Sequence, residues 1–579
     1  MIRSNYDKHP QVEVSGMDDQ CWSGWVEVMK VLSGRRDAKV VVIECYVGVA
    51  VAEIVAAVRE HIPSASVFEA EKAFHQPEEI EGKVAPFLGD GDPIFGYSSA
   101  LRMEDFFSPE KLAGLREGMA AVKSGVVVII GPGASIVCRG DLLVYAEMPR
   151  YEAQGRMRRN EMSNLGTRNQ ELKWNLQYKR AFFNDWPICD RLKLGLKDID
   201  FILDTCKPGE PKMISWQAAA KACETALSRP FRVVPFFDPA PWGGQWMKKT
   251  MALPDDAPNY GWCFDCVPEE NSILFRFGGI IVELPSMNVV FSDPSRLLGS
   301  RVHARFGLSF PIRFDLLDTV GGGNLSFQVH PFTDYIQRHF GIHYTQDESY
   351  YLLAAEADSS VYLGLKEGIV PEGMIAALEA AQSSGEAFDD ERFVCKWPAK
   401  AHDHFLIPAG TCHCSGAGTL VLEISATPNI FTFKLWDWGR LGLDGQPRPI
   451  NIERGKANIA WERTENWVRR ELVNAVTDVA SGDGWREERT GLHELEFIET
   501  RRHWFTGTVE HHTGGGVNVL NLVEGREAVV ESPTGAFEPF VVHYAETFIV
   551  PACVGAYTIR PFGQGEGTTC ATLKAYVRA

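Results

Sequence analysis

Two short sequence patterns constrain the fold of this chain more than any other feature. The first, Ser-Phe-Gln-Val-His at Ser326–His330, predicts a β-strand. Successive side chains of a strand point to opposite faces, so Gln328 and His330 share one face. The second, Pro-Ala-Gly-Thr-Cys-His at Pro408–His413, predicts a tight turn that delivers His413 onto the next strand. Glu348, which begins an apolar run between these patterns, adds a carboxylate.

These residues offer the donor atoms of a metal site. Gln328, His330, Glu348 and His413 supply one amide oxygen, two imidazoles and one carboxylate. Such nitrogen and oxygen ligands suit a borderline divalent ion such as zinc, and four of them leave a position open for a substrate oxygen. Each residue alone has a plainer interpretation, as a core histidine, a backbone-bonded amide or a turn cap. Their combination in this order favours the metal site.

The layout resembles the cupin barrel and, more narrowly, the type I mannose-6-phosphate isomerases. The matching blocks follow the family order from about residue 230 to the end: Pro241–Gly244, Phe310–Ile312, Ser326–Pro331, Glu348, Val361–Leu365, Ile407–His413, Val421–Ile424 and Trp436–Trp438. The resemblance implies that Gln328, His330, Glu348 and His413 hold one zinc ion per chain. It also implies that a sugar phosphate is the small-molecule partner, and that mannose 6-phosphate and fructose 6-phosphate are interconverted.

Such an isomerase moves a proton between neighbouring carbons through an enediol or enediolate. A zinc ion stabilises the developing oxyanion, while protein groups move the proton and stabilise charge. We expect Glu423, Lys434 and Arg440 in these roles. Lys434 falls one residue out of register with the family arginine, and Arg440 follows Trp436–Gly439. The plainer interpretations are a buried, hydrogen-bonded glutamate and two surface charges.

Fewer basic residues are expected around the site in this chain than in the family. Asp315 replaces a family lysine, Gln346 and Asp347 replace a pair that begins with lysine, and Phe332 stands where aspartate often follows. Two alternatives therefore stay open. One is an isomerase of another or a non-phosphorylated sugar. The other is a non-catalytic protein that binds a sugar or sugar phosphate.

Residues 1–228 predict an α/β domain with a parallel sheet. β-Branched runs alternate with helical stretches, in the order Lys39–Glu44, Ala52–His61, Ser108–Lys123, Gly125–Ala134 and Leu142–Pro149. Together with the basic run Arg150, Arg156, Arg158 and Arg159, this order resembles a P-loop nucleoside or uridine kinase. The loop after the first strand lacks the lysine and the serine or threonine that bind phosphate and magnesium. We therefore expect a degenerate kinase-like domain, and a bifunctional kinase–isomerase is a third alternative.

The rest of the chain predicts short strands in two cupin (jelly-roll) barrels. Residues 229–484 form the metal-binding barrel with helical insertions, and a helix over Asn466–Ala480 leads to the second barrel, residues 485–579. Phe548–Ala552 echoes Phe405–Ala409, but Ala556 stands where His413 would be expected. We therefore expect the second barrel to bind no metal.

Composition limits the class of protein. A chain of 579 residues is too long for one domain, and its net charge of -18 argues against nucleic acid as the main partner. Its 13 scattered cysteines, with Cys263 and Cys266 as a lone C-x-x-C pair, suit a reducing compartment. The N-terminus lacks the pattern of a signal peptide, and the apolar stretch Val40–Val58 carries two glutamates, which argues against a membrane span. We expect a cytoplasmic protein, and the oligomeric state is left open.

Overall fold

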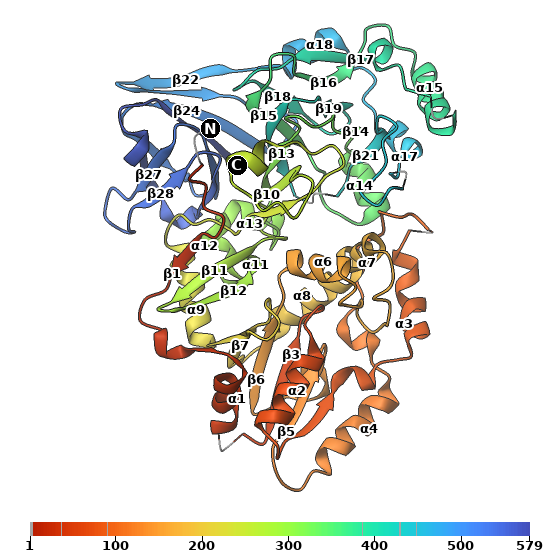
Figure 1. The fold of residues 1–579 in the computed structure, drawn as a ribbon, viewed down its shortest axis with the longest axis vertical. Coiled ribbons are helices and arrows are strands. Elements are labelled where there is room, and N and C mark those ends of the chain that lie inside the picture. The colour runs from red at the N-terminus through yellow and green to blue at the C-terminus, as the bar shows by residue number, and fades with distance from the viewer. Residues whose placement is uncertain are drawn as a thin grey trace.

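The computed structural model describes residues 4–35, 38–89, 91–384, 386–427, 430–446 and 448–578. Within these residues it is a mixed α/β protein whose strands form six sheets (Figure 1). Met1–Arg3, part of the segment judged to lack a signal peptide, lie outside this description. Among the described helices, none is both long and apolar enough to cross a membrane.

The front of the chain up to Leu227, which we call the front domain, folds around a seven-stranded sheet. Its order is β2 (Cys21–Ser23), β8 (Lys212–Ser215), β7 (Phe201–Asp204), β6 (Leu142–Glu147), β3 (Val40–Cys45), β5 (Val127–Gly131) and β4 (Ser66–Glu69). The five strands from β7 to β4 pair in parallel, and β8 and β2 add an antiparallel edge. The predicted parallel sheet is therefore confirmed.

Helices accompany this sheet. They are α1 (Trp25–Gly34), α2 (Val51–His61), α3 (Pro77–Val84), α4 (Pro109–Ala120), α5 (Ala134–Val137), α6 (Arg150–Arg158), α7 (Trp174–Arg180), α8 (Trp186–Gly195) and α9 (Trp216–Leu227). The predicted helices at Ala52–His61 and after Ser108 are present, and the Ser108 hydroxyl caps α4 by accepting a hydrogen bond from the Lys111 backbone. A short sheet of β1 (Gln11–Glu13), β11 (Ser272–Phe277) and β12 (Ile280–Pro285) ties the N-terminal segment to the middle of the chain.

The middle of the chain forms two sheets that share one core. The first contains, in order, β18 (His404–Ile407), β15 (Glu348–Ala355), β20 (Thr419–Ala426), β13 (Ile312–Asp318), β10 (Trp262–Cys266) and β9 (Phe236–Asp238). The second contains β17 (Val394–Pro398), β16 (Ser360–Leu365), β19 (His413–Ser415), β14 (Phe327–Val329) and β21 (Phe433–Trp436). Leu352 and Val421 of the first sheet pack in one cluster with Val329 and Leu363 of the second. We call this pair of sheets the middle barrel.

The middle part of the chain also contains helices. They are α10 (Trp246–Thr250), α11 (Met287–Ser292), α12 (Pro294–Leu298), α13 (Ser300–Phe306), α14 (Thr333–Phe340), α15 (Pro371–Ser384), α16 (Asp390–Phe393), α17 (Ile452–Lys456) and α18 (Glu465–Glu471). The helical insertion expected around Pro371–Gly385 is present as α15, and Gly385 lies outside the described residues.

The helix predicted over Asn466–Ala480 is wrong beyond its first turns. α18 ends at Glu471, and the chain continues as β22 (Thr477–Gly482). Asn474 adopts a left-handed φ of 49° and exchanges hydrogen bonds with His404, so the chain turns away from the helix axis. The β-branched residues that follow favour a strand over a helix.

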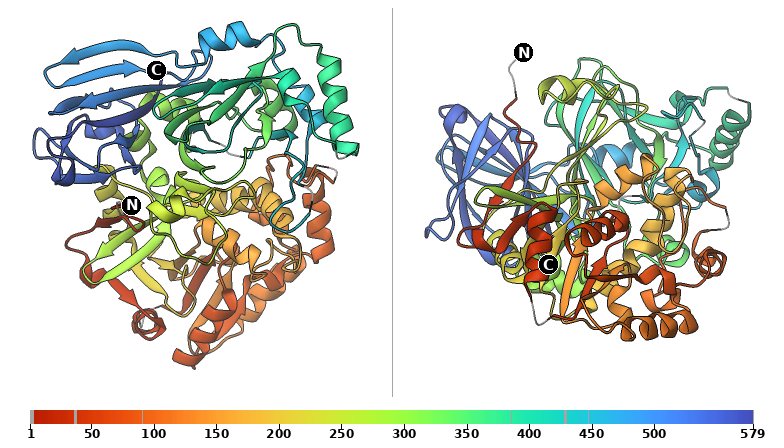
Figure 2. Two further views of the ribbon diagram at one scale, coloured as in Figure 1. Left: turned by 45° about the horizontal axis from the view of Figure 1, so that its top comes forward. Right: turned by 60° about the horizontal axis from the view of Figure 1, so that its bottom comes forward.

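The end of the chain forms two further sheets, which we call the last barrel. One contains β22, β23 (Trp485–Arg489), β24 (Ile498–Phe505), β31 (Cys570–Val577), β26 (Asn518–Glu524) and β29 (Thr547–Val550). The other contains β25 (Val509–His512), β30 (Ala556–Pro561), β27 (Glu527–Glu531) and β28 (Phe540–His543). Figure 2 shows the last barrel in blue beside the green middle barrel, with the red and orange front of the chain next to the middle barrel.

Candidate metal centre

Three strands and one turn bring the four candidate ligands together. Gln328 on β14 lies opposite His413, the first residue of β19, and His330 follows β14 directly. Glu348 begins β15 in the other sheet of the middle barrel. The turn before His413 depends on Gly410, whose φ of 90° is open to glycine but strained for other residues.

Three of the four candidate ligands, His330, Glu348 and His413, bring their ligand atoms together in a fully buried cluster. Glu348 Oε2 is 3.1 Å from His330 Nε2, and Glu348 Oε1 is 2.9 Å from His413 Nε2. One donor atom from each of these three residues lies within 4.8 Å of the others. The amide nitrogen of Gln328, not its oxygen, lies 3.3 Å from His413 Nε2. Ligation by Gln328 oxygen therefore requires its amide group to turn over.

Backbone carbonyls fix which ring nitrogen of each histidine carries hydrogen. Nδ1 of His330 lies 2.9 Å from the Phe431 oxygen, and Nδ1 of His413 lies 2.8 Å from the Thr411 oxygen. A carbonyl only accepts, so both Nδ1 atoms donate. In their neutral form, the rings would aim two Nε2 lone pairs at the Glu348 carboxylate, an arrangement that repels unless a proton or cation lies between them.

This cluster fits a divalent cation. His330 Nε2 and Glu348 Oε1 are buried without a hydrogen-bond partner, and such atoms are costly unless a ligand satisfies them. Burial tends to raise the pKa of Glu348, but positive charge on the side of His330 and His413 lowers it well below its ordinary value. The carboxylate is therefore ionised, and the histidines donate their second nitrogens to carbonyls as metal-bound histidines do.

Glu423 belongs to a buried ion-pair network beside the cluster. Arg313 Nη2 contacts the Glu423 carboxylate and lies 2.8 Å from Asp315 Oδ2. Burial raises the pKa of Glu423 well above its ordinary value, while Arg313 opposes this rise. Asp315, where the resemblance implies a lysine, lies opposite Glu423, and Arg313 supplies a cation two residues earlier on the same strand face. Sequence reasoning missed Arg313, although strand alternation places it on that face.

Lys434 and Arg440 occupy different positions relative to the cluster. Lys434 is half-buried on β21 opposite Gln328, whereas Arg440 follows this strand and lies 2.6 Å from Asp437 Oδ1. Arg448 lies 2.8 Å from the other oxygen of Asp437. Sequence reasoning missed Arg448, because it lies in a loop without a recognisable pattern.

The arginines of the basic run in the front domain pair with carboxylates of the same chain. Arg150 pairs with Asp190, Arg158 pairs with Asp238, and Arg156 and Arg159 pair with Glu152. Each arginine therefore already has a carboxylate partner within the chain.

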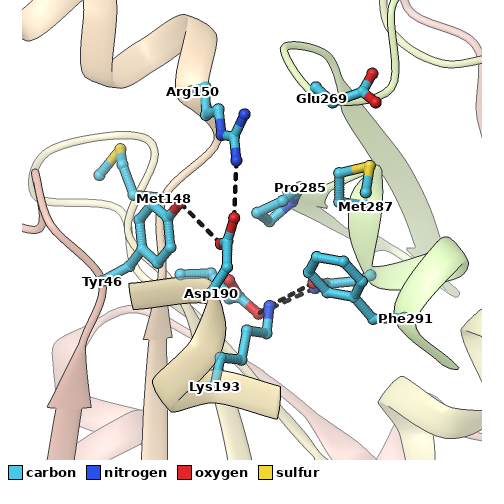
Figure 3. Close-up of a pocket in the computed structure, with 11 residues that line it drawn as sticks. Tyr46, Met148, Arg150, Asp190, Lys193, Glu269, Pro285, Met287 and Phe291 are labelled. Carbon is cyan, nitrogen blue, oxygen red and sulfur yellow. Dashed lines mark hydrogen bonds and ion pairs between the residues drawn. The ribbon is translucent and has the colours of Figure 1, made fainter. Parts of the chain in front are cut away.

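The carboxyl edge of the front sheet, where parallel sheets bind ligands, holds a cavity of about 20 Å³ (Figure 3). It is crossed by ion pairs of 2.8 Å between Arg150 and Asp190 and 2.5 Å between Lys193 and Glu147. This volume suits about one water molecule, far less than a nucleotide needs. The Gly131–Gly133 turn is also occupied, because the Glu44 carboxylate accepts the Gly133 N–H at 2.7 Å.

Comparisons with known proteins match different parts of the chain. A model of a domain of unknown function, DUF8485, matches residues 24–228. The mannose-6-phosphate isomerase of Streptococcus mutans is 25% identical over 215 residues, which are 37% of this chain and 62% of that protein. Mannose-6-phosphate isomerase ManA of Bacillus subtilis is 25% identical over 148 residues, or 26% of this chain and 44% of ManA. The chain thus spans less than two thirds of the length of these relatives.

Among solved structures, the mannose 6-phosphate isomerase from Bacillus subtilis is similar to this chain with a TM-score of 0.48 and 18% sequence identity. That similarity covers 60% of this chain and 100% of the other.

Proposed function

We propose that this chain is a zinc-dependent aldose–ketose isomerase that interconverts mannose 6-phosphate and fructose 6-phosphate. The observation that carries the proposal is the pair of Nε2 atoms, of His330 and His413, that face the buried carboxylate of Glu348. Nitrogen and oxygen ligands of this kind suit zinc. Relatives named mannose-6-phosphate isomerase support the same reaction.

His330, Glu348 and His413 would hold the ion, with Gln328 as the fourth ligand once its amide group turns over. When bound, zinc supplies a Lewis acid that polarises the sugar oxygens beside the carbons that exchange a proton. Lys434 is the proposed proton carrier. Burial lowers its pKa to about 7, so near neutral pH it can both take up and return a proton.

Arg440 and Arg448 are the proposed anchor for the substrate phosphate. Both guanidinium groups lie against one carboxylate, that of Asp437, so the trio keeps a net positive charge. Arginine forms paired hydrogen bonds to phosphate oxygens. We assign Glu423 to positioning rather than to proton transfer, because its carboxylate is engaged by Arg313.

The proposal extends to the domains. Residues 229–484 and 485–579 would be two cupin barrels, the second without metal, behind a degenerate kinase-like domain at 1–228. β22 (Thr477–Gly482) belongs to the sheet of the second barrel, so the boundary between the barrels would lie before this strand rather than at 484. The pairs of sheets around shared cores support the barrels. The small cavity of about 20 Å³ at the carboxyl edge of the parallel sheet supports a front domain without nucleotide binding at that edge.

Metal analysis tests the site. We expect about one zinc ion per wild-type chain and none in His413→Ala. His404→Gln is the matched control, because His404 is equally buried in the same barrel but bonds the hydroxyl of Ser349. Retention of zinc by His413→Ala contradicts the site.

An activity assay tests the reaction. We expect conversion of mannose 6-phosphate to fructose 6-phosphate that a chelator abolishes and zinc restores. Turnover of free mannose alone would favour the isomerase of a non-phosphorylated sugar. Binding of the sugar phosphate without interconversion would favour the non-catalytic protein.

A further inference from the structure

The carbonyl that orients His330 belongs to a residue packed against the front domain. The ring centroid of Phe431 lies 6.1 Å from that of Phe95, 6.3 Å from that of Phe182 and 6.2 Å from that of Phe183. All three rings come from the region matched by the domain of unknown function. The middle barrel itself adds Phe340, whose ring centroid is 5.0 Å from that of Phe431.

The segment that carries Phe95 is fixed to the middle barrel on both sides. Before it, Asp92 lies 2.9 Å from Arg454, whose guanidinium also stacks 5.6 Å from the Phe95 ring centroid. After it, the Ser98 N–H donates to the Phe340 carbonyl at 2.9 Å. Figure 1 shows α14, which ends at Phe340, facing the front domain across this contact.

This segment is closely packed at Gly96, next to Phe95. A Cβ atom added to Gly96 would lie 2.4 Å from the Phe87 oxygen, closer than real contacts allow, and 3.0 Å from the Phe183 ring, which is a tight contact. The segment that carries Phe95 is therefore also packed tightly against Phe183.

Phe431 depends on this packing for its position. It precedes β21, which begins at Phe433, so no strand pairing holds its peptide group. Its side chain is fully buried, and its carbonyl oxygen lies 2.9 Å from His330 Nδ1. A shift of the Phe431 ring would move its carbonyl group and break the hydrogen bond that His330 Nδ1 donates to it.

We infer that the front domain positions a ligand of the metal centre. Its Phe95 and Phe183 rings fix the position of the Phe431 carbonyl, and this carbonyl holds His330 with Nε2 toward Glu348. This role rests on the proposed function where the ion is concerned. Loss of a group that orients a metal-bound histidine typically weakens metal binding by about 10- to 100-fold.

Full-length variants test the inference by zinc affinity, measured by competition with a chromogenic chelator. We expect Phe95→Leu and Phe183→Leu to bind zinc about tenfold more weakly than the wild type. Phe106→Leu is the matched control: Phe106 is fully buried in the front domain, with its ring centroid 6.1 Å from that of Phe74. It should lower the melting temperature but keep the zinc affinity. Unchanged affinity in Phe95→Leu and Phe183→Leu, or an equal loss in Phe106→Leu, would overturn the inference.

A second measurement needs no metal. In the metal-free protein, we expect Phe95→Leu and Phe183→Leu to speed amide hydrogen exchange at residues 430–433 by about tenfold, and Phe106→Leu to leave it unchanged. A wild type that binds no zinc but shows this exchange pattern would end the isomerase proposal and keep the positioning role. Exchange that is the same in all variants would overturn that role even if zinc binds.

Discussion

Lys434 lies directly opposite Gln328 in the antiparallel pairing of β21 with β14. Directly opposed side chains project from the same face of a sheet, so the lysine and the candidate ligand share one face. Burial, assisted by Arg448 and opposed by Asp437, lowers the pKa of Lys434 to about 7. Lysine is therefore suited here to proton transfer rather than to fixed charge.

A pH profile tests this role. Only unprotonated Lys434 can accept the substrate proton, so kcat should rise with pH through a midpoint of about 7. Lys434→Met should lower kcat by at least about 100-fold, the usual loss when a general base is removed, and should keep the zinc content. Steady-state assays from pH 5.5 to 9 provide the measurement. If the variant keeps both its rate and the wild-type midpoint, another group transfers the proton.

The paired arginines predict a selective effect on the phosphate of the substrate. Arg448→Gln should raise KM for mannose 6-phosphate by about tenfold, since a charge-assisted hydrogen bond contributes about 1.5 kcal/mol, and should change kcat little. Arg469→Gln is the control, because that arginine pairs with Glu465 on the surface. Phosphate should inhibit the wild type more strongly than Arg448→Gln. Equal inhibition of both would show that Arg448 does not contact the anion.

The strands around the site could be predicted from the sequence, because the alternation of side chains along a strand and the residue preferences of turns are local properties. Gln328 and His330 share a face by strand geometry, and Pro408 and Gly410 mark the turn before His413. The charges around these residues were less predictable. The cation expected at Asp315 is supplied by Arg313, which only the register between β13 and β20 brings against Glu423.

Contacts between distant segments were beyond sequence reasoning. The apolar residues between Asn466 and Ala480 fit a helical period, yet pairing of Asn474 with His404 ends the helix and starts a strand. The packing of Phe95 on Phe431 joins the front domain to the middle barrel, and neither residue carries a local sequence signal. The side-chain amide orientation of Gln328 likewise depends on the histidine that faces it.

Gly410→Ala should damage the metal centre through the turn before His413. Gly410 has a φ of 90°, and an added Cβ would lie 2.4 Å from the Phe332 ring. Strained backbone at such a position costs about 1 to 3 kcal/mol, and the collision adds to it. Gly368→Ala is the matched control, since Gly368 has a φ of 72° with nothing within 4 Å of an added Cβ. Urea unfolding should show a larger loss in Gly410→Ala, and only this variant should lose zinc affinity. Equal losses of stability would assign the whole effect to backbone strain.

His404 predicts how stability depends on pH. Its Nε2 lies 2.9 Å from the Ser349 hydroxyl, its Nδ1 is buried without a partner, and burial, with Arg502, lowers its pKa to about 3. The pKa of histidine in an unfolded chain is about 6.5. Between about pH 3 and about pH 6.5, His404 is therefore protonated in the unfolded state but neutral in the folded state. Stability from this residue is therefore complete above about pH 6.5 and is lost progressively as the pH falls toward 3.

Urea unfolding at half-unit steps from pH 7 to pH 4 measures this dependence. The wild type should take up about one extra proton on unfolding over this range from His404, and His404→Gln should flatten the slope by that amount. His343→Gln is the control, because His343 is exposed. Glutamine can still donate to Ser349 but does not titrate, so a variant that is less stable at pH 7 and less sensitive to acid is the expected result. A slope that is unchanged in His404→Gln would mean that other buried groups control the acid sensitivity of the middle barrel.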